Sequence, residues 1–266
     1  MFTFALRMKT VQKPFYPKIE ILAEEYEIPQ LDRKRRISVL LPHNYYETNK
    51  KYPVLYLHDG QNLFDEYAPY GNWGVDKALA NLADQGYGDI IIVAIDHGGK
   101  LRIQEYLPYP TSRYSDAQGE LYLKFVMEDL KPMIDSRFRV LHQREFTGIG
   151  GSSLGGLISL YAGFSFKHIF GKMMIFSPSL WISEEIYNMA RNFVPFDKTD
   201  IYLYAGGMES ANHYGNVLRM ENLLQQKRKY DDFDVIFSHN PSGEHREIHW
   251  GEQFPKALKW LYFNKY

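Results

Sequence analysis

The chain has 266 residues, 45% hydrophobic and 24% charged, an ordinary globular composition that excludes an intrinsically disordered protein. Its formal net charge of −1 gives no electrostatic reason to expect nucleic acid or a membrane as a partner, and it leaves the oligomeric state open. Cysteine is absent, which excludes disulfides, thiol catalysis and cysteine-based zinc sites. Because no stretch approaches the roughly 18 apolar residues of a membrane-spanning helix, we expect a cytoplasmic protein with a single domain over residues 1–266.

The first third of the chain predicts antiparallel strands, and the remainder alternates strands with helices. Residues 19–28 and 35–41 predict the antiparallel strands, while the apolar runs 52–57 and 90–95 are typical of strands buried on both faces. Further strands are expected at 145–149, 172–176, 201–205 and 233–237, and helices at 75–85, 121–138, 157–164, 184–192, 215–229 and 252–262. This order predicts an α/β fold with a mostly parallel central sheet, antiparallel N-terminal strands and helices on both faces.

Two compositional features allow both a structural and a functional interpretation. The basic run Arg33-Lys34-Arg35-Arg36 is expected on the solvated start or edge of a strand, with phosphate binding as the alternative. The 21 tyrosines fit ordinary packing at strands and rims, with the lining of a pocket for an aromatic or sugar-like ligand as the alternative.

The segment from Gly151 to Gly155 has the pattern G-x-S-x-G, with Ser153 at its centre. A strand is predicted before it and an apolar helix after it, which is the context in which a sharp strand-to-helix turn exposes a serine hydroxyl. Ser152 is the local alternative as nucleophile. The same segment fits neither a Walker A loop, since no Lys-Ser or Lys-Thr follows, nor the dinucleotide-binding pattern.

A serine hydroxyl needs a base, and chain order favours a late histidine preceded by an acid. His245 lies in the turn between the last predicted strand and the final helix, whereas His249 lies four residues further on. Because Glu247 stands between them as H-x-E-x-H, a zinc site remains a weaker alternative. Glu209 follows the predicted strand 201–205 and is the candidate acid, with a solvated loop carboxylate as the alternative.

From about residue 35 onward, the chain resembles the esterase D-like branch of the α/β-hydrolases, which includes enterochelin, salmochelin and feruloyl esterases and some acyltransferases. The resemblance rests on separate segments in the right order: Leu55–Phe64, Ile95-Asp96 with Arg102 and Glu105-Tyr106, Phe176–Trp181, and Gly243–His245 with Trp250 and Leu258–Leu261.

The resemblance implies that Ser153 and His245 are catalytic, that Glu209 is at the acid position, and that the backbone N–H groups of Gln61 and Leu154 form the oxyanion hole. It implies a serine esterase that needs no metal or organic cofactor and acts on a small-molecule ester of siderophore, feruloyl or acetyl type. An acyltransferase and a non-catalytic hydrolase-like binding protein are the alternatives. We expect four further residues to line the substrate pocket: Arg102, Tyr106, Trp181 and His213.

Overall fold

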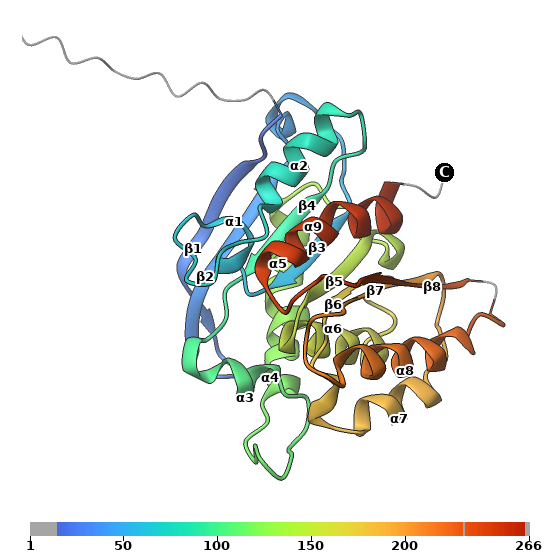
Figure 1. Ribbon diagram of the computed structural model, residues 1–266. Coiled ribbons are helices and arrows are strands. Elements are labelled where there is room, and N and C mark those ends of the chain that lie inside the picture. Colours follow the sequence, from blue (N-terminus) through green and yellow to red (C-terminus); the bar gives the residue numbers. More distant parts are fainter. Residues whose placement is uncertain (1–14, 231, 264–266) are drawn as a thin grey trace, which may run out of the picture.

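The computed structural model describes residues 15–230 and 232–263 (Figure 1). Its strands are β1 (Lys18–Ile28), β2 (Arg33–Leu41), β3 (Val54–His58), β4 (Ile91–Ile95), β5 (Thr147–Ser152), β6 (Lys172–Phe176), β7 (Thr199–Gly206) and β8 (Phe233–Asn240). They form one sheet in the order β1-β2-β4-β3-β5-β6-β7-β8. β2 pairs antiparallel with both β1 and β4, and the strands from β4 to β8 pair parallel. The predicted mixed, mostly parallel sheet is confirmed.

Helices cover both faces of this sheet (Figure 1). They are α1 (Gln61–Phe64), α2 (Val75–Asp84), α3 (Arg102–Tyr106), α4 (Gly119–Lys124), α5 (Lys131–Arg137), α6 (Leu154–Ser165), α7 (Glu185–Asn192), α8 (His213–Gln225) and α9 (Glu247–Leu258). Helices α2 and α9 pack together and contribute Leu82 and Phe254 to one apolar core, whereas α6 and α8 contribute Leu157 and Val217 to the other. The predicted helices on both faces are therefore confirmed.

The sequence of β4 (Ile91–Ile95) shows why strands of this sheet have apolar residues at every position. Its residues Ile91, Val93 and Ile95 belong to the core under α6, while Ile92 and Ala94 belong to the core under α9. Successive side chains of a strand point to opposite faces, so a strand covered on both sides needs apolar residues at every position.

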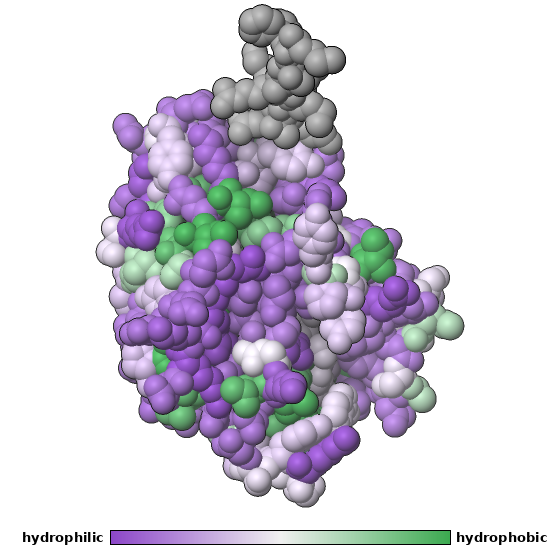
Figure 2. Space-filling view, turned by 90° about the vertical axis from the view of Figure 1, so that its left-hand side faces the viewer, coloured by the Kyte–Doolittle hydropathy of each residue, from purple (hydrophilic) through white to green (hydrophobic). Residues whose placement is uncertain are grey.

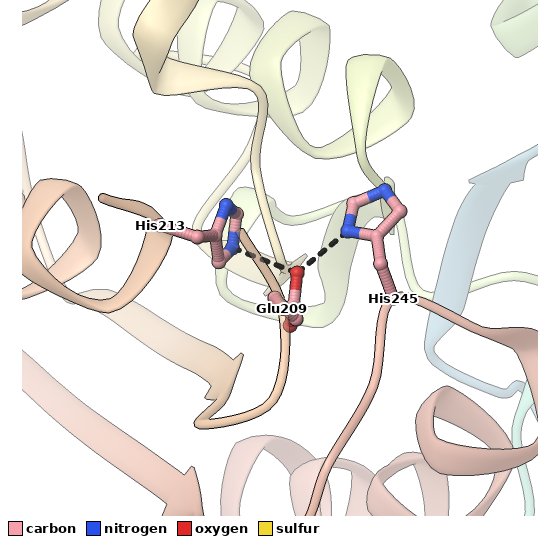
Figure 3. A group of neighbouring side chains, drawn as sticks. All are labelled: Glu209, His213 and His245. Carbon is pink, nitrogen blue, oxygen red and sulfur yellow. Dashed lines mark hydrogen bonds and ion pairs between the residues drawn. The ribbon is translucent and has the colours of Figure 1, made fainter. Parts of the chain in front are cut away.

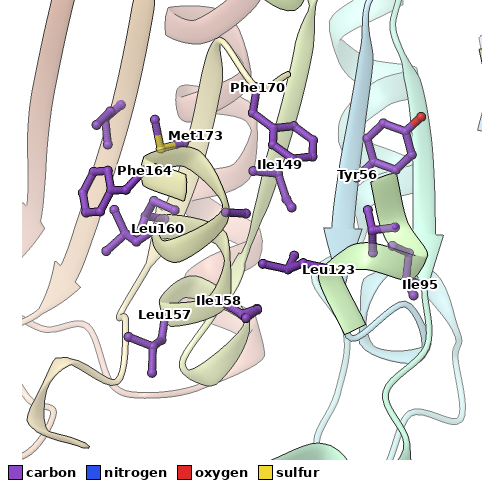
Figure 4. Packing of buried hydrophobic residues seen from close by; sticks show 14 of the residues in the cluster. Tyr56, Ile95, Leu123, Ile149, Leu157, Ile158, Leu160, Phe164, Phe170 and Met173 are labelled. Atoms are coloured by element: carbon purple, nitrogen blue, oxygen red, sulfur yellow. The ribbon is translucent and has the colours of Figure 1, made fainter. Parts of the chain in front are cut away.

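Helix α6 packs closely on the strand that precedes it. Leu157, Ile158 and Leu160 of this helix lie near Ile149 of β5 in the apolar core (Figure 4). β5 itself carries glycines, and a Cβ added to Gly150 would meet the carbonyl oxygen of Met174 at 2.6 Å. The absence of side chains there allows β5 and β6 to lie at the spacing that positions the turn after β5.

The helix expected over 121–138 contains a π-helical stretch. Phe125–Leu130 is π-helical between α4 and α5, so the helical segment is continuous but widened in its middle. The last predicted helix begins earlier than expected, because α9 starts at Glu247.

The basic run lies at the start of β2, as expected, but β2 is not an edge strand and, of the four residues, Lys34 is the exposed one. Arg35 is 5% exposed, and its guanidinium donates two hydrogen bonds to the buried carboxylate of Glu105, at 2.9 Å each. Arg36 is paired with Asp65 and with Asp96. These guanidinium groups thus join β2 to α3 and to the segments that follow α1 and β4, and each is already paired with a carboxylate.

β1 forms the edge of the sheet and lies on the left of Figure 1, the side that faces the viewer in Figure 2. The surface there is largely hydrophilic, with a separate apolar patch. β1 carries exposed glutamates beside the exposed apolar side chains Ile19 and Ile21. Charges on an edge strand oppose pairing with another chain.

Within the described part of the chain, no helix has both the length and the apolar character needed to cross a membrane.

Candidate active site

Ser153 occupies a strained turn between β5 and α6. Its backbone has φ 58° and ψ −120°, a region that residues other than glycine rarely adopt. The turn is held from both sides, since the Ser153 N–H donates to the carbonyl of Phe176 at 2.9 Å and its carbonyl accepts from Leu157 at 3.1 Å. A Cβ on Gly151 would lie 3.0 Å from the backbone of Gly155, so small residues are needed on both sides. This geometry is that of the sharp turn predicted for a nucleophile.

His245 and Glu209 meet from two separate loops at the carboxyl ends of the strands (Figure 3). The Nδ1 atom of His245 lies 2.6 Å from Oε2 of Glu209. An Nδ1–H that donates to this carboxylate leaves Nε2 of the same imidazole as the basic nitrogen. The Glu209 side chain is 1% exposed whereas that of His245 is 42% exposed, so the alternative of a solvated loop carboxylate is wrong.

The buried carboxylate of Glu209 is ionised because donors surround it. Its Oε1 accepts from the Ser177 hydroxyl at 2.6 Å and from the Gly206 N–H at 2.7 Å. Burial opposes ionisation, but the hydrogen bonds from His245 and Ser177 outweigh it and hold the pKa of Glu209 below its usual value. The Trp250 indole donates to the Ser177 hydroxyl at 2.9 Å, and the Trp250 ring lies edge-on to His245, with centroids 4.9 Å apart.

Ser153 and His245 line the same cavity, which has a volume of about 810 Å³. The Ser153 hydroxyl lies 3.2 Å from the Ser179 hydroxyl, and this is the hydrogen bond recorded for it within the described residues. Catalytic hydrogen bonds between nucleophile and base often tighten only when substrate binds. Ser152 also borders the cavity, but it is the last residue of β5, whereas Ser153 has the strained backbone.

Gln61 and Leu154 both begin helices, α1 and α6. The first N–H groups of a helix have no partner within it, and these two amides are in that position. Two hydrogen bonds hold the backbone around Gln61 in place. The side-chain oxygen of Gln61 accepts from the His97 N–H at 3.0 Å, and the Gly60 N–H donates to the carbonyl of Ile95 at 2.8 Å. A Cβ on Gly60 would meet a carboxylate oxygen of Asp96 at 2.6 Å, so this close approach requires glycine.

The residues expected to line the substrate pocket do not all do so. Arg102 lines the cavity, but its guanidinium is held by both oxygens of Asp59, at 2.6 and 2.8 Å. Tyr106 is fully buried, with its hydroxyl accepting from the Asp59 N–H at 3.4 Å, so it supports the wall from behind. Trp181 is 57% exposed outside the cavity lining, and His213 is buried beside Glu209. Of these four residues, Arg102 is thus the one that the structure brings to the lining of this cavity.

Sequence reasoning assigned no role to several residues that hold the site together. Ser177 has a positive φ of 42° directly after β6, and Ser179 lies two residues further on. Both follow a parallel strand at the edge where ligands bind, and this position along the chain points to Ser177 as a candidate from the sequence. Asp59 and Tyr70 border the cavity as well. Most of the largest buried tyrosines, such as Tyr56 and Tyr187, pack in the core, in agreement with the structural interpretation of the tyrosine content.

The geometry does not fit a metal site. His249 lies in the first turn of α9 with its Nδ1 3.5 Å from Glu252, so His245 and His249 have different partners. Glu209, His213 and His245 bring possible ligand atoms within 4.8 Å of one another. However, tetrahedral zinc bonds of about 2.0–2.2 Å separate two ligand atoms by roughly 3.3 Å. The 2.6 Å between His245 Nδ1 and Glu209 Oε2 is too short for two ligands of one zinc ion and fits a charge-assisted hydrogen bond.

This mixed sheet, with a serine at a strained strand-to-helix turn and an imidazole–carboxylate pair at the same edge, is the α/β-hydrolase fold. The chain belongs to the esterase family whose model is described as "Putative esterase", which matches residues 28–261. It is thus a member of a family of ester hydrolases.

Individual relatives are more distant. The uncharacterized protein YbbA of Bacillus subtilis is 24% identical over 240 residues, covering 86% of this chain and 92% of the relative. The siderophore hydrolase EstB of Aspergillus nidulans superposes with a TM-score of 0.71 at 23% identity, covering 94% of this chain and 96% of that one. An IroE-like serine hydrolase of Shewanella oneidensis gives a TM-score of 0.73 at 20% identity, covering 91% and 79%. At these identities the structural likeness establishes the fold.

Proposed function

We propose that the protein is a serine carboxylic ester hydrolase that works through an acyl-enzyme, with Ser153 as nucleophile, His245 as base and Glu209 as acid. The observation that carries the proposal is the coincidence of two features in one cavity: Ser153 on a strained turn, and His245 held through Nδ1 by a buried carboxylate. A strained turn costs free energy, and a buried carboxylate is costly unless hydrogen bonds satisfy it. Because neither feature stabilises the fold, their presence at one cavity favours a role in catalysis.

In the proposed reaction, Ser153 Oγ attacks the ester carbonyl carbon while Nε2 of His245 takes the hydroxyl proton. The carbonyl oxygen becomes an oxyanion that accepts from the backbone N–H groups of Gln61 and Leu154. The C–O bond to the alcohol then breaks, and the His245 imidazolium protonates the departing alcohol. Water, deprotonated by His245, attacks the acyl-enzyme, releasing the acid and restoring the Ser153 hydroxyl.

The cavity supports the proposed class of substrate. A volume of about 810 Å³ admits a small or aromatic acyl ester, and the lining combines the aromatic rings Tyr70 and Trp250 with charged groups such as Arg102 and Glu247. Polar lining of this kind suits an oxygen-rich ester better than a long alkyl chain. The proposed substrates are siderophore, feruloyl or acetyl esters, and the name of the similar siderophore hydrolase supports the first of these.

The test combines labelling with substitution. We expect Ser153→Ala to fold normally and to lower kcat for p-nitrophenyl acetate by about 10⁴- to 10⁶-fold, the scale of triad nucleophiles. A fluorophosphonate probe should label the wild type at Ser153, and Ser152→Ala serves as the matched control that keeps both label and activity. Labelling at Ser152, or activity that survives Ser153→Ala, contradicts the proposal. Adding alcohols to the assay separates hydrolysis from acyl transfer.

A further inference from the structure

His213 is a buried imidazole beside the proposed triad that takes no part in the steps above. It is the first residue of α8, and its side chain is 4% exposed. Its Nε2 lies 3.1 Å from Oε2 of Glu209, the same oxygen that is 2.6 Å from Nδ1 of His245 (Figure 3). The two imidazole rings meet edge to face, with centroids 5.7 Å apart.

With His213 included, each Glu209 oxygen faces two donors. Oε1 accepts from Ser177 and Gly206, and Oε2 lies between His245 and His213. An ionised carboxylate has about four lone-pair sites, so this set would use all of them. The His213 ring lies off the ideal hydrogen-bond angle, which leaves its Nε2 without a formal partner among the described residues. The distance of 3.1 Å is within hydrogen-bond range, so the angle is what separates this ion pair from a hydrogen bond.

We propose that His213 is a positioning residue of the triad: its neutral imidazole donates to Oε2 of Glu209 and so limits how strongly Glu209 holds a proton on His245. The inference rests on the proposed function of Ser153, His245 and Glu209. When two donors bind the same carboxylate oxygen, both interact with one negative charge, so each hydrogen bond is weaker than it would be alone. Without His213, Glu209 stabilises the His245 imidazolium more, and the basic form of His245 becomes scarcer at a given pH.

The electrostatic surroundings support a neutral His213. Burial lowers its pKa, opposed by the charge of Glu209 and assisted by that of His245. His245 faces several charged groups besides these, which a substitution at position 213 leaves in place: Glu244, Arg246 and Glu247 on its own loop and α9, and Asp59 and Arg102 across the cavity.

The experiment compares His213→Leu, which removes the donor, with His213→Gln, whose amide can replace Nε2–H. We expect His213→Leu to lower kcat by about 3- to 10-fold on the acid limb, where less of His245 is in its basic form, with KM nearly unchanged. The acid limb of kcat/KM should move to higher pH by about half a unit to one unit. His213→Gln should restore most of both quantities. His239→Leu removes a nearby exposed imidazole that packs on Tyr214, and it is the control that should change neither.

A spectroscopic measurement gives a readout that is independent of turnover. In Ser153→Ala protein, the downfield proton resonance of the His245 Nδ1–H should shift when His213→Leu is added and return with His213→Gln. An unchanged resonance and pH profile in a folded His213→Leu protein would overturn the inference, as would a His213→Gln protein as impaired as His213→Leu. The proposed function fails in a different way, by activity that survives Ser153→Ala.

Discussion

Glu209 has an ionised carboxylate in a buried position because donors occupy its oxygens. We expect Glu209→Gln to lower kcat by about 10² to 10³-fold, roughly 3 to 4 kcal/mol, with little change in KM. The amide keeps the size of the side chain but not the charge that stabilises the imidazolium, and this charge matters in the transition state. Steady-state kinetics on a folded variant would check this. If Glu209→Gln keeps nearly full activity, the site is a Ser153–His245 dyad.

The two neighbouring histidines His245 and His249 should behave differently. His245→Ala should lose activity on the scale of Ser153→Ala, whereas His249→Ala should lose little, because His249 faces Glu252 in the first turn of α9. For the wild type, kcat/KM should rise with pH on the acid side of its profile, since the base must be unprotonated. Loss of activity in a chelator, with recovery on adding zinc, would instead favour the H-x-E-x-H metal site.

At the level of elements, close approach of β5 to β6 sets the position of the turn that carries Ser153. We expect Gly150→Ala to lower the free energy of unfolding by about 1 to 3 kcal/mol, because its Cβ would meet the carbonyl oxygen of Met174 at 2.6 Å and the Cβ of Met174 at 2.7 Å. Gly215 in α8 is the matched control, since a Cβ there meets no atom within 4 Å. Gly215→Ala should raise stability by about 0.5 to 1 kcal/mol through its helix propensity. Urea unfolding of both variants measures the difference, and equal midpoints would contradict this account of β5.

For the molecule as a whole, His58 at the end of β3 links stability to pH. It is fully buried, its Nδ1 is 2.8 Å from the Tyr122 hydroxyl, and burial lowers its pKa to about 4. The unfolded chain takes up this proton near pH 6.5, but the native state does so only near 4. The unfolded state therefore binds more protons in this window, and the contribution of His58 to stability is lost as pH falls from 6.5 towards 4.

We predict that the difference in free energy of unfolding between the wild type and His58→Gln changes with pH. As pH falls from 7 to 4, the wild type should lose roughly 2 to 4 kcal/mol of unfolding free energy relative to the variant. Burial raises the pKa of Asp96 to about 6, so the contribution of Asp96 to the free energy of unfolding rises as pH falls over much of the same range. Because both proteins contain Asp96, the difference between them isolates the effect of His58. Urea unfolding at both pH values measures it. A constant difference would mean that His58 is not held neutral by the fold.

The sequence by itself determined the parallel sheet, its antiparallel start and the turn at Ser153. These features depend on short stretches, such as the apolar run of β4 and the glycines on either side of Ser152 and Ser153, whose local geometry follows from periodicity and from the absence of side chains. The order of Ser153, Glu209 and His245 along the chain predicted candidate roles, which the experiments above test. No pattern of spacing could show that hydrogen bonds from Ser177, Gly206 and His245 converge on Glu209.

Only the tertiary structure decided where the remaining polar side chains lie. Tyr106 and Arg102 are four residues apart, yet one is buried behind the cavity wall and the other borders the cavity. Arg35 reaches Glu105 across 70 positions of the chain, and Trp250 reaches Ser177 across 73. A buried charge or donor must find a partner wherever the fold brings one within about 3 Å. Strand order and loop paths determine which distant residues come together, so the residue types alone cannot predict these partners.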